Sequence, residues 1–492
     1  MAGITYTDEL LALWRLRWTN GYTPIANRPD GRADSIARAA FYHANAGTDY
    51  VTTDVRTTDP AHGEFVVSAA FQYLMDGTGG SAVHDHLLAQ VQEAGCDYGS
   101  FPDGDLGTIG NATVRFSSTW VMNMFLVYDY TYDLYSVGEK AIIDAWFYDA
   151  AVFFQRSLSQ GVFETQFPNR NADDNYLTNA ALVADQAAHT AGRFYYSKET
   201  NLNYELTGSK TGNISDYTER AYAQRDYSVT AGATASGSMT TRYTHMDNSG
   251  VLHNQLSDSG AFWSNQQAMM VRVVALAGKY FGNAMMQDHS KLWAEESLKY
   301  GTYPDGTTTE YRRNEVASPM LGASFYNMII IEGLMWVADL YPNNSIWQYS
   351  TSTGIHGTEG GTKNIRLLIE RVMQICTTVY DDADSIYFYE GKSEANLLDT
   401  QRTATYRYLP EVPLSWANRY YQEDAIKQVY LLTAANSNPY SATGWTYPFA
   451  TIFEWGGANA NFPEFVYMFH ETEDLFITPT IAKRGIRSLL MI

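Results

Sequence analysis

Cysteine is scarce in this chain, which excludes a fold stabilised by several disulfides or by a cysteine-rich zinc site. The 492 residues include two cysteines, Cys96 and Cys376, which lie far apart in the sequence. Two cysteines at this spacing form neither a disulfide framework nor a zinc-binding motif. We therefore expect a fold held together by a hydrophobic core, with both thiols free and buried.

Basic residues are also few. The chain has 33 Lys and Arg against 54 Asp and Glu, which gives a net charge of −21. Nucleic acids require a basic face that neutralises phosphates, so we expect no nucleic acid as a partner. The same charge disfavours a polyanionic sugar unless the arginines gather in one cleft, because local potential rather than net charge steers a ligand.

Long hydrophobic runs are missing as well. No run reaches the length of about 18 apolar residues that spans a bilayer, and Met1 to Arg17 does not have the pattern of a signal peptide. We expect a soluble chain without a membrane partner. The expected location is secreted or periplasmic if a leader was removed, and is otherwise unknown.

The sequence contains no linker, short-period repeat or low-complexity tract, which predicts a single domain over residues 1–492. Hydrophobic residues make up 45% of the chain, enough for a large core, and tyrosine is abundant at 37 residues. Tyrosine combines an apolar face with a polar edge. It suits both a sugar-binding surface and a core with satisfied hydroxyls.

Apolar periodicity predicts an all-α protein. Helices are expected over residues 5–19, 34–46, 63–76, 81–94, 116–134, 138–159, 365–378, 411–435 and 462–470. Helices that are apolar on most sides alternate with amphipathic ones, which suggests an inner and an outer ring. The polar segment from Lys198 to Ser259 has no helical period and is expected to form binding loops or lids. Ser345 to Asn364 is expected to be a loop.

The stretch from Leu298 to Tyr341 is the part of the sequence that is most informative about function. It opens with a turn at Pro304 to Gly306, because proline presets one turn dihedral and glycine tolerates the positive one. An acidic and doubly basic segment follows. Leu321 to Tyr341 then predicts a buried helix that Pro342 ends, with Tyr326 and Asn327 as polar groups near its start.

This pattern resembles the alginate lyases of polysaccharide lyase family 5, which carry a glutamate and arginines after a glycine turn and then a tyrosine on an apolar helix. The matching residues are Gly306, Glu310, Arg312, Arg313 and Tyr326, with Tyr326 further from the arginines than in the family. The flanks Gly260–Gly278 and Ile369–Asp399 look like the neighbouring family segments, so the resemblance covers roughly residues 255 to 430. It implies an (α/α) toroid, an incomplete (α/α) barrel with long polar loops over the cleft, that cleaves an acidic polysaccharide without metal or cofactor.

The chain departs from the family at the Asn-Asn-His signature. Asp258, Ser259 and Gly260 occupy the aligned positions, and His253-Asn254 lies just before them. Either His253 and Asn254 take over this role from a shifted loop, or a neutralising group comes from elsewhere, such as Asn169 or Asn171.

Uronate lyases remove a proton from the carbon next to a carboxylate and expel the 4-oxygen, so donors that neutralise the carboxylate lower the barrier most. The resemblance makes Tyr326 the base or acid and Arg313 the carboxylate ligand, because arginine binds carboxylates through a bidentate fork. His253 and Asn254 assist. Substrate contacts are assigned to Arg312, Asn169, Arg170, Asn171, Trp263 and Glu310.

Other interpretations stay open. Tyr326 could be a core tyrosine with a satisfied hydroxyl, and the tandem arginines could be surface salt-bridge partners. An inverting glycoside hydrolase on a similar toroid would use two carboxylates from Asp258, Glu310 and Asp173 or Asp174. A non-catalytic carbohydrate-binding or virion protein would use aromatic residues alone. A metal site at His84-Asp85-His86 is disfavoured, because a helix places the two imidazoles on different faces and leaves a solvated helix face as the simpler role.

Overall fold

A computed structural model shows the chain to be mainly helical. It describes residues 3–20, 36–37, 39–40, 42–44, 60–92, 111–158, 244–246, 252–254, 265–299, 301–302, 306, 308, 327–354, 357–377 and 411–429. Helix accounts for 82% of this part of the chain, and the strands described here form two short hairpins. The predicted all-α class is therefore confirmed.

The chain divides into two compact units. The first unit comprises Met1–Ser100, Ala112–Ala150 and Leu409–Ile492, and the second comprises Phe101–Asn111 and Ala151–Tyr408. The division falls within helix α6 (Val137–Leu158), so the last turns of this helix belong to the second unit. The single domain expected over residues 1–492 stays a prediction.

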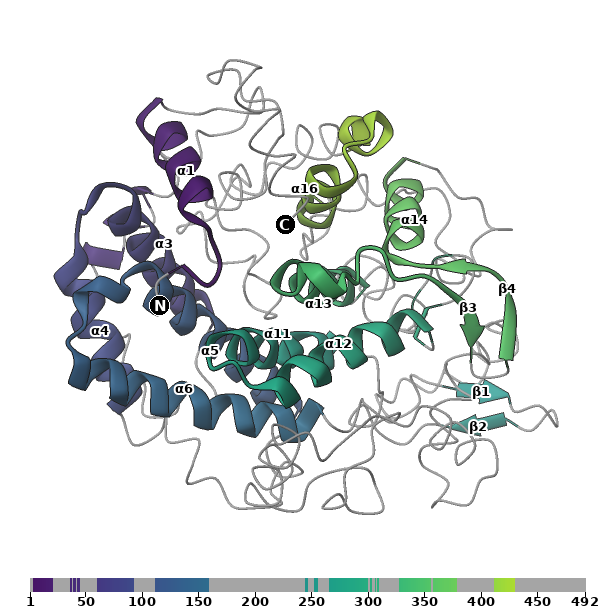
Figure 1. Ribbon diagram of the computed structural model, residues 1–492, viewed down its shortest axis with the longest axis horizontal. Coiled ribbons are helices and arrows are strands. Elements are labelled where there is room, and N and C mark those ends of the chain that lie inside the picture. The colour runs from purple at the N-terminus through teal and green to yellow at the C-terminus, as the bar shows by residue number, and fades with distance from the viewer. Residues whose placement is uncertain are drawn as a thin grey trace, which may run out of the picture. The chain divides into compact units, whose positions relative to one another are not determined.

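The described residues of the first unit are mainly helical (Figure 1). They are α1 (Asp8–Asn20), α3 (Pro60–Asp76), α4 (Gly80–Gln92), α5 (Asn111–Tyr130), η4 (Tyr132–Leu134), most of α6, and α16 (Glu411–Tyr421). Residues 424–429 and the described positions between 36 and 44 are also helical. The predicted helices over 5–19, 63–76, 81–94, 116–134 and 138–159 are thus confirmed, with ends shifted by a few residues.

Local side-chain contacts set where some of these helices begin. The Thr7 hydroxyl accepts a hydrogen bond from the Leu10 N–H at the start of α1 (3.2 Å). Ser136 and Glu139 form a capping box at the start of α6: the Ser136 N–H donates to Glu139 Oε2 (2.7 Å), and the Glu139 N–H donates to Ser136 Oγ (3.3 Å). These helix starts are therefore encoded within a few residues of sequence.

Helix α5 is buried at every position from 118 to 130, as its almost uniformly apolar sequence predicts. Its buried carboxylate, Asp129, binds the segment before α1. The N–H groups of Gly3 and Ile4 donate to Asp129 Oδ1 (3.1 and 2.9 Å), and the Thr5 N–H and hydroxyl donate to Oδ2 (3.0 and 2.6 Å). Burial raises the pKa of Asp129, and these hydrogen bonds oppose the rise.

Among its described residues, the second unit contains the end of α6, four further helices, a 3-10 turn and two antiparallel hairpins (Figure 1). The helices are α11 (Asn265–Tyr280), α12 (Ala284–Lys299), α13 (Asn327–Leu340) and α14 (Ile365–Thr377), and the turn is η10 (Pro342–Asn344). The hairpins pair β1 (Thr244–Met246) with β2 (Leu252–Asn254), and β3 (Thr351–Gly354) with β4 (Gly357–Lys363).

Helices α11, α12 and α13 pack together and form the core of the second unit (Figure 1). The contacts advance in the same order along α11 and α13: Gly333 lies against Ala268, and the Tyr341 hydroxyl, just after α13, donates to the Ala275 carbonyl. The two helices therefore run in the same direction. Every residue of α13 except Asp339 is buried, as its apolar sequence predicts.

The β3–β4 hairpin corrects the prediction of a loop over Ser345–Asn364. Thr351 pairs with Lys363 and Gly354 pairs with Gly357, with an irregular register between these pairs. The strands consist mainly of threonine and glycine, so they have no apolar alternation by which a strand is recognised. The buried Lys363 side chain donates to the Lys299 carbonyl at the end of α12, which fixes the hairpin to the core.

In the part of the chain that the structure describes, no helix combines the length and apolar character needed to cross a membrane.

Candidate functional site

The turn that opens the predicted site is present. Thr302 and Thr308 form an isolated antiparallel bridge around it, and Gly306 has a φ of +80°. A Cβ atom added to Gly306 would lie 2.8 Å from the Leu367 carbonyl oxygen of α14. Glycine is required here both for the backbone conformation and for the close contact with α14, as expected for the last residue of the predicted turn, whereas Pro304 and Asp305 lie outside the described residues.

A buried hydrogen bond joins this turn to the start of α13. The Thr308 hydroxyl donates to Asn327 Oδ1 (2.8 Å) across 19 positions of the chain, and both residues are 1% exposed. On the other side of the turn, the Thr302 hydroxyl donates to the Ser297 carbonyl in the last turn of α12 (2.8 Å). The turn is thus held by α12, α13 and α14 together.

Most of the predicted site residues lie outside the described residues. They are Tyr326, Arg313, Arg312, Glu310, Asn169, Arg170, Asn171 and Trp263, and the hydrolase candidates Asp173, Asp174 and Asp258 are outside as well. Among the described residues, His253 and Asn254 lie in β2, where their backbones pair with His245 and Thr244 of β1. His253 and Asn254 are thus the one pair of predicted site residues that the described part of the chain brings together, and they are neighbours in sequence.

A buried ion pair links α11 and α13. Arg272 Nη1 lies 3.8 Å from Glu332 Oε2, and the two side chains are 0% and 1% exposed. Burial raises the pKa of Glu332 to about 8, although the Arg272 guanidinium acts to lower it. The separation exceeds that of a hydrogen bond, so the attraction is too weak to offset desolvation of the carboxylate. Glu332 therefore titrates near neutral pH inside the core.

The sequence predictions did not include Arg272 and Glu332, although the sequence carries a signal for both. Each is the single charged residue within the apolar body of its helix, in VRVVALAG and MIIIEGLMW respectively. An ionisable residue in an otherwise apolar helix must be paired, because an isolated buried charge is very costly. Two such residues of opposite sign in neighbouring helices indicate a pair.

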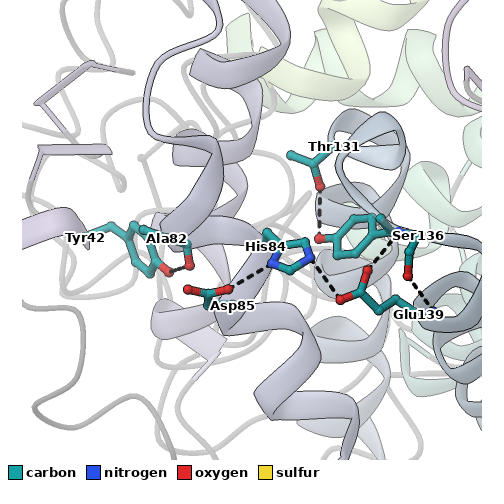
Figure 2. A network of polar contacts seen from close by, with 8 residues as sticks. Tyr42, Ala82, His84, Asp85, Thr131, Ser136 and Glu139 are labelled. Atoms are coloured by element: carbon teal, nitrogen blue, oxygen red, sulfur yellow. Dashed lines mark hydrogen bonds and ion pairs between the residues drawn. The ribbon is translucent and has the colours of Figure 1, made fainter.

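His84 in the first unit takes part in a network of polar contacts, shown in Figure 2. Its Nδ1 lies 2.9 Å from Asp85 Oδ1 and its Nε2 lies 3.4 Å from Glu139 Oε1, while its ring stacks on Tyr135 with centroids 5.0 Å apart. The hydrogen bonds with the Ser136 backbone and then with its side chain hold the pKa of Glu139 below its usual range. Asp85 lies on the same helix as His84, whereas Glu139 lies on α6. The contact between His84 and Glu139 therefore links α4 to the start of α6.

His86 makes different contacts. Its ring packs edge-on against Tyr42, with centroids 5.5 Å apart, so the two imidazoles lie on different faces of α4 as predicted. The expected solvated face is seen at Asp85, which is exposed, whereas His84 and His86 are half-buried. Among the described residues, no group of three His, Cys, Asp or Glu side chains is arranged to bind a metal ion.

The described residues form a mainly helical protein whose second unit has a few polar side chains buried in an apolar core. Comparison of the chain with protein-family models, with curated proteins and with solved structures finds no match in any of the three. The resemblance to alginate lyases accordingly rests on the sequence motif.

Proposed function

We propose that the protein is a polysaccharide lyase that cleaves a uronic-acid polysaccharide, alginate or a related polyuronate, by metal-independent β-elimination. The observation that carries the proposal is the buried hydrogen bond between Thr308 and Asn327. Glu310 follows Thr308 by two residues, and Tyr326 directly precedes Asn327. Consecutive Cα atoms are about 3.8 Å apart, so this bond lies within a few residues, along the chain, of both Glu310 and Tyr326.

The proposed fold is an incomplete (α/α) toroid with long polar loops over the cleft. The alternation of buried and amphipathic helices in the sequence supports it, as does the high helix content of the described residues. Helix α13, which directly follows Tyr326, is buried at its first position.

The chemistry needs one proton acceptor, one proton donor and donors to the carboxylate. Tyr326 removes the proton from C5 of the uronate, and the electron pair of that C–H bond forms the C4–C5 double bond. The C4–O bond breaks, and the leaving oxygen takes a proton from the same tyrosine. Arg313 neutralises the carboxylate with the help of His253 and Asn254.

Substrate contacts outside the reacting atoms are proposed for the remaining motif and loop residues. They are Arg312, Glu310, Asn169, Arg170, Asn171 and Trp263. Arginines and asparagines supply donors to carboxylates and hydroxyls, and tryptophan supplies a flat apolar face for a sugar ring.

The decisive test is ultraviolet absorbance of the unsaturated product during incubation with alginate, its pure blocks and glucuronan, in the presence of a metal chelator. We expect absorbance to grow and to be lost in Tyr326→Phe, by a factor of at least about 100, because general acid–base catalysis contributes about that much. Tyr341→Phe is the matched control at the other end of α13. It removes a hydroxyl bound to the Ala275 carbonyl and should lower stability while sparing activity.

The opposite result is equally informative. If no polyuronate yields absorbance while neutral glycans gain reducing ends, the protein is a hydrolase rather than a lyase. Asp258→Asn would then abolish activity and Tyr326→Phe would not. Sugar binding without any product would indicate a carbohydrate-binding protein.

A further inference from the structure

An asparagine stands at the start of each of the helices α11 to α14 in the second unit, and Asn283 and Asn364 cap their helices. Asn283 Oδ1 accepts a hydrogen bond from the Met286 N–H at the start of α12 (3.0 Å). Asn364 Oδ1 accepts one from the Leu367 N–H at the start of α14 (2.8 Å). In both cases the amide oxygen satisfies a backbone N–H group that has no partner within the helix.

Asn327, at the start of α13, is different. Its Oδ1 accepts a hydrogen bond from the Thr308 hydroxyl rather than from the backbone of its own helix. Its side chain is 1% exposed, and its Nδ2 group has no hydrogen-bond acceptor among the described residues. A buried amide donor without an acceptor costs about 1–3 kcal/mol, so this arrangement indicates an acceptor that is absent from the described part of the chain.

The surroundings of this amide favour a negatively charged acceptor. Asn327 is the first residue of a 14-residue helix, and the Cα–Cβ bonds of a helix tilt toward its N-terminus. The free donors of Asn327 therefore lie at the same end as the first backbone N–H groups of α13 and the positive end of its dipole. Donors from a side chain, a backbone and a dipole at one place suit an anion.

We propose that Asn327 donates its amide N–H groups to the carboxylate of a uronate at the start of α13. This inference rests on the proposed lyase function and adds a binding residue that the motif does not contain. Thr308 is a positioning residue: by donating to Oδ1 it turns the Nδ2 group of Asn327 toward the ligand. The amide would stabilise the carboxylate most as negative charge builds up on it when the C5 proton leaves.

The first test compares Asn327→Asp with wild type. Aspartate keeps an oxygen for the Thr308 hydroxyl, and the helix N-terminus opposes the cost of burying its negative charge; circular dichroism first checks that the variant is folded. It has no donor for a carboxylate and repels it. We expect kcat/KM on the polyuronate that wild type cleaves to fall by at least about 100-fold.

Asn364→Asp is the matched control, because it makes the same change at a helix start where the amide oxygen already caps its own helix. Its kcat/KM should stay within about twofold of wild type, since surface-like substitutions without a binding role have small effects. An Asn327→Asp protein that is folded and as active as this control would overturn the inference and leave the lyase proposal standing.

The positioning role is tested separately and does not depend on Asn327→Asp folding. Thr308→Val removes the hydroxyl and should raise KM, whereas Thr308→Ser keeps it and should restore the wild-type KM. Equal KM values for wild type, Thr308→Val and Thr308→Ser would contradict the proposal.

A last measurement separates this inference from the proposed function. If wild type forms no unsaturated product, the lyase proposal fails, and calorimetric titration with a uronate oligosaccharide tests the anion site alone. Binding to wild type that Asn327→Asp lacks would support the site. Equal binding by both proteins, or binding by neither, would refute it.

Discussion

A few polar residues are buried among apolar side chains in the helices of the second unit. Glu332 and Arg272 interrupt the apolar bodies of their helices, Asn327 begins α13, and each of the three is nearly fully buried. Their residue types could be read from the sequence, but their partners could not. Pairing of Arg272 with Glu332 depends on how α11 packs against α13, and the bond from Thr308 to Asn327 depends on the turn at Gly306.

Glu332 makes stability depend on pH. Its pKa is about 8 in the folded protein against a usual value of 4.5, so between these values the folded state holds a proton that the unfolded state has released. The contribution of Glu332 to the free energy of unfolding should therefore be largest below pH 4.5 and should fall as the pH rises toward 8. The slope is at most about 1.4 kcal/mol per pH unit.

Urea unfolding of wild type and Glu332→Gln between pH 4.5 and 8 measures this contribution. Glutamine cannot titrate, so the variant should lose the slope that Glu332 supplies. The difference between the two curves removes the contributions of all groups that titrate alike in both proteins. Parallel curves would show that Glu332 does not titrate in this range.

At the scale of elements, the helices could be predicted and their connections could not. Periodicity and length define a helix such as α6 or α14 within a few residues, because burial of one face or of all faces dictates its composition. The β3–β4 hairpin escaped prediction because its strands are held by backbone pairing and carry little apolar side-chain pattern. Among the connections, the turn at Gly306 was predictable from Pro304-Asp305-Gly306 alone.

The Gly306 turn yields a prediction with an internal control. Gly306 and Gly77 have the same φ of +80°, but a Cβ at Gly306 would meet the Leu367 carbonyl oxygen at 2.8 Å, whereas nothing lies within 4 Å of one at Gly77. Gly77→Ala should cost about 1–2 kcal/mol from backbone strain alone. Gly306→Ala should cost about 2–4 kcal/mol, because it adds a steric clash with α14. Urea midpoints measure both, and equal losses would mean that the contact with α14 is loose.

At the scale of the whole molecule, the net charge follows directly from the sequence. Its negative sign opposes binding of the proposed polyanionic substrate. A net charge of −21 repels a polyuronate at long range. Arginines and helix N-termini attract it only at short range, where screening by salt is weak. The two effects therefore differ in their dependence on ionic strength.

This difference predicts an unusual salt response. The Debye length falls from about 30 Å at 0.01 M salt to about 10 Å at 0.1 M, which removes long-range repulsion and leaves contacts within the site largely intact. We expect kcat/KM on a long polyuronate to rise severalfold over this range, and that on a uronate trisaccharide, which carries few charges, to rise much less. Initial rates at a series of salt concentrations measure both. A steady fall from the lowest salt concentration would instead mean that a basic surface around the site dominates the approach of the substrate, and that the acidic residues lie too far from the site to oppose it.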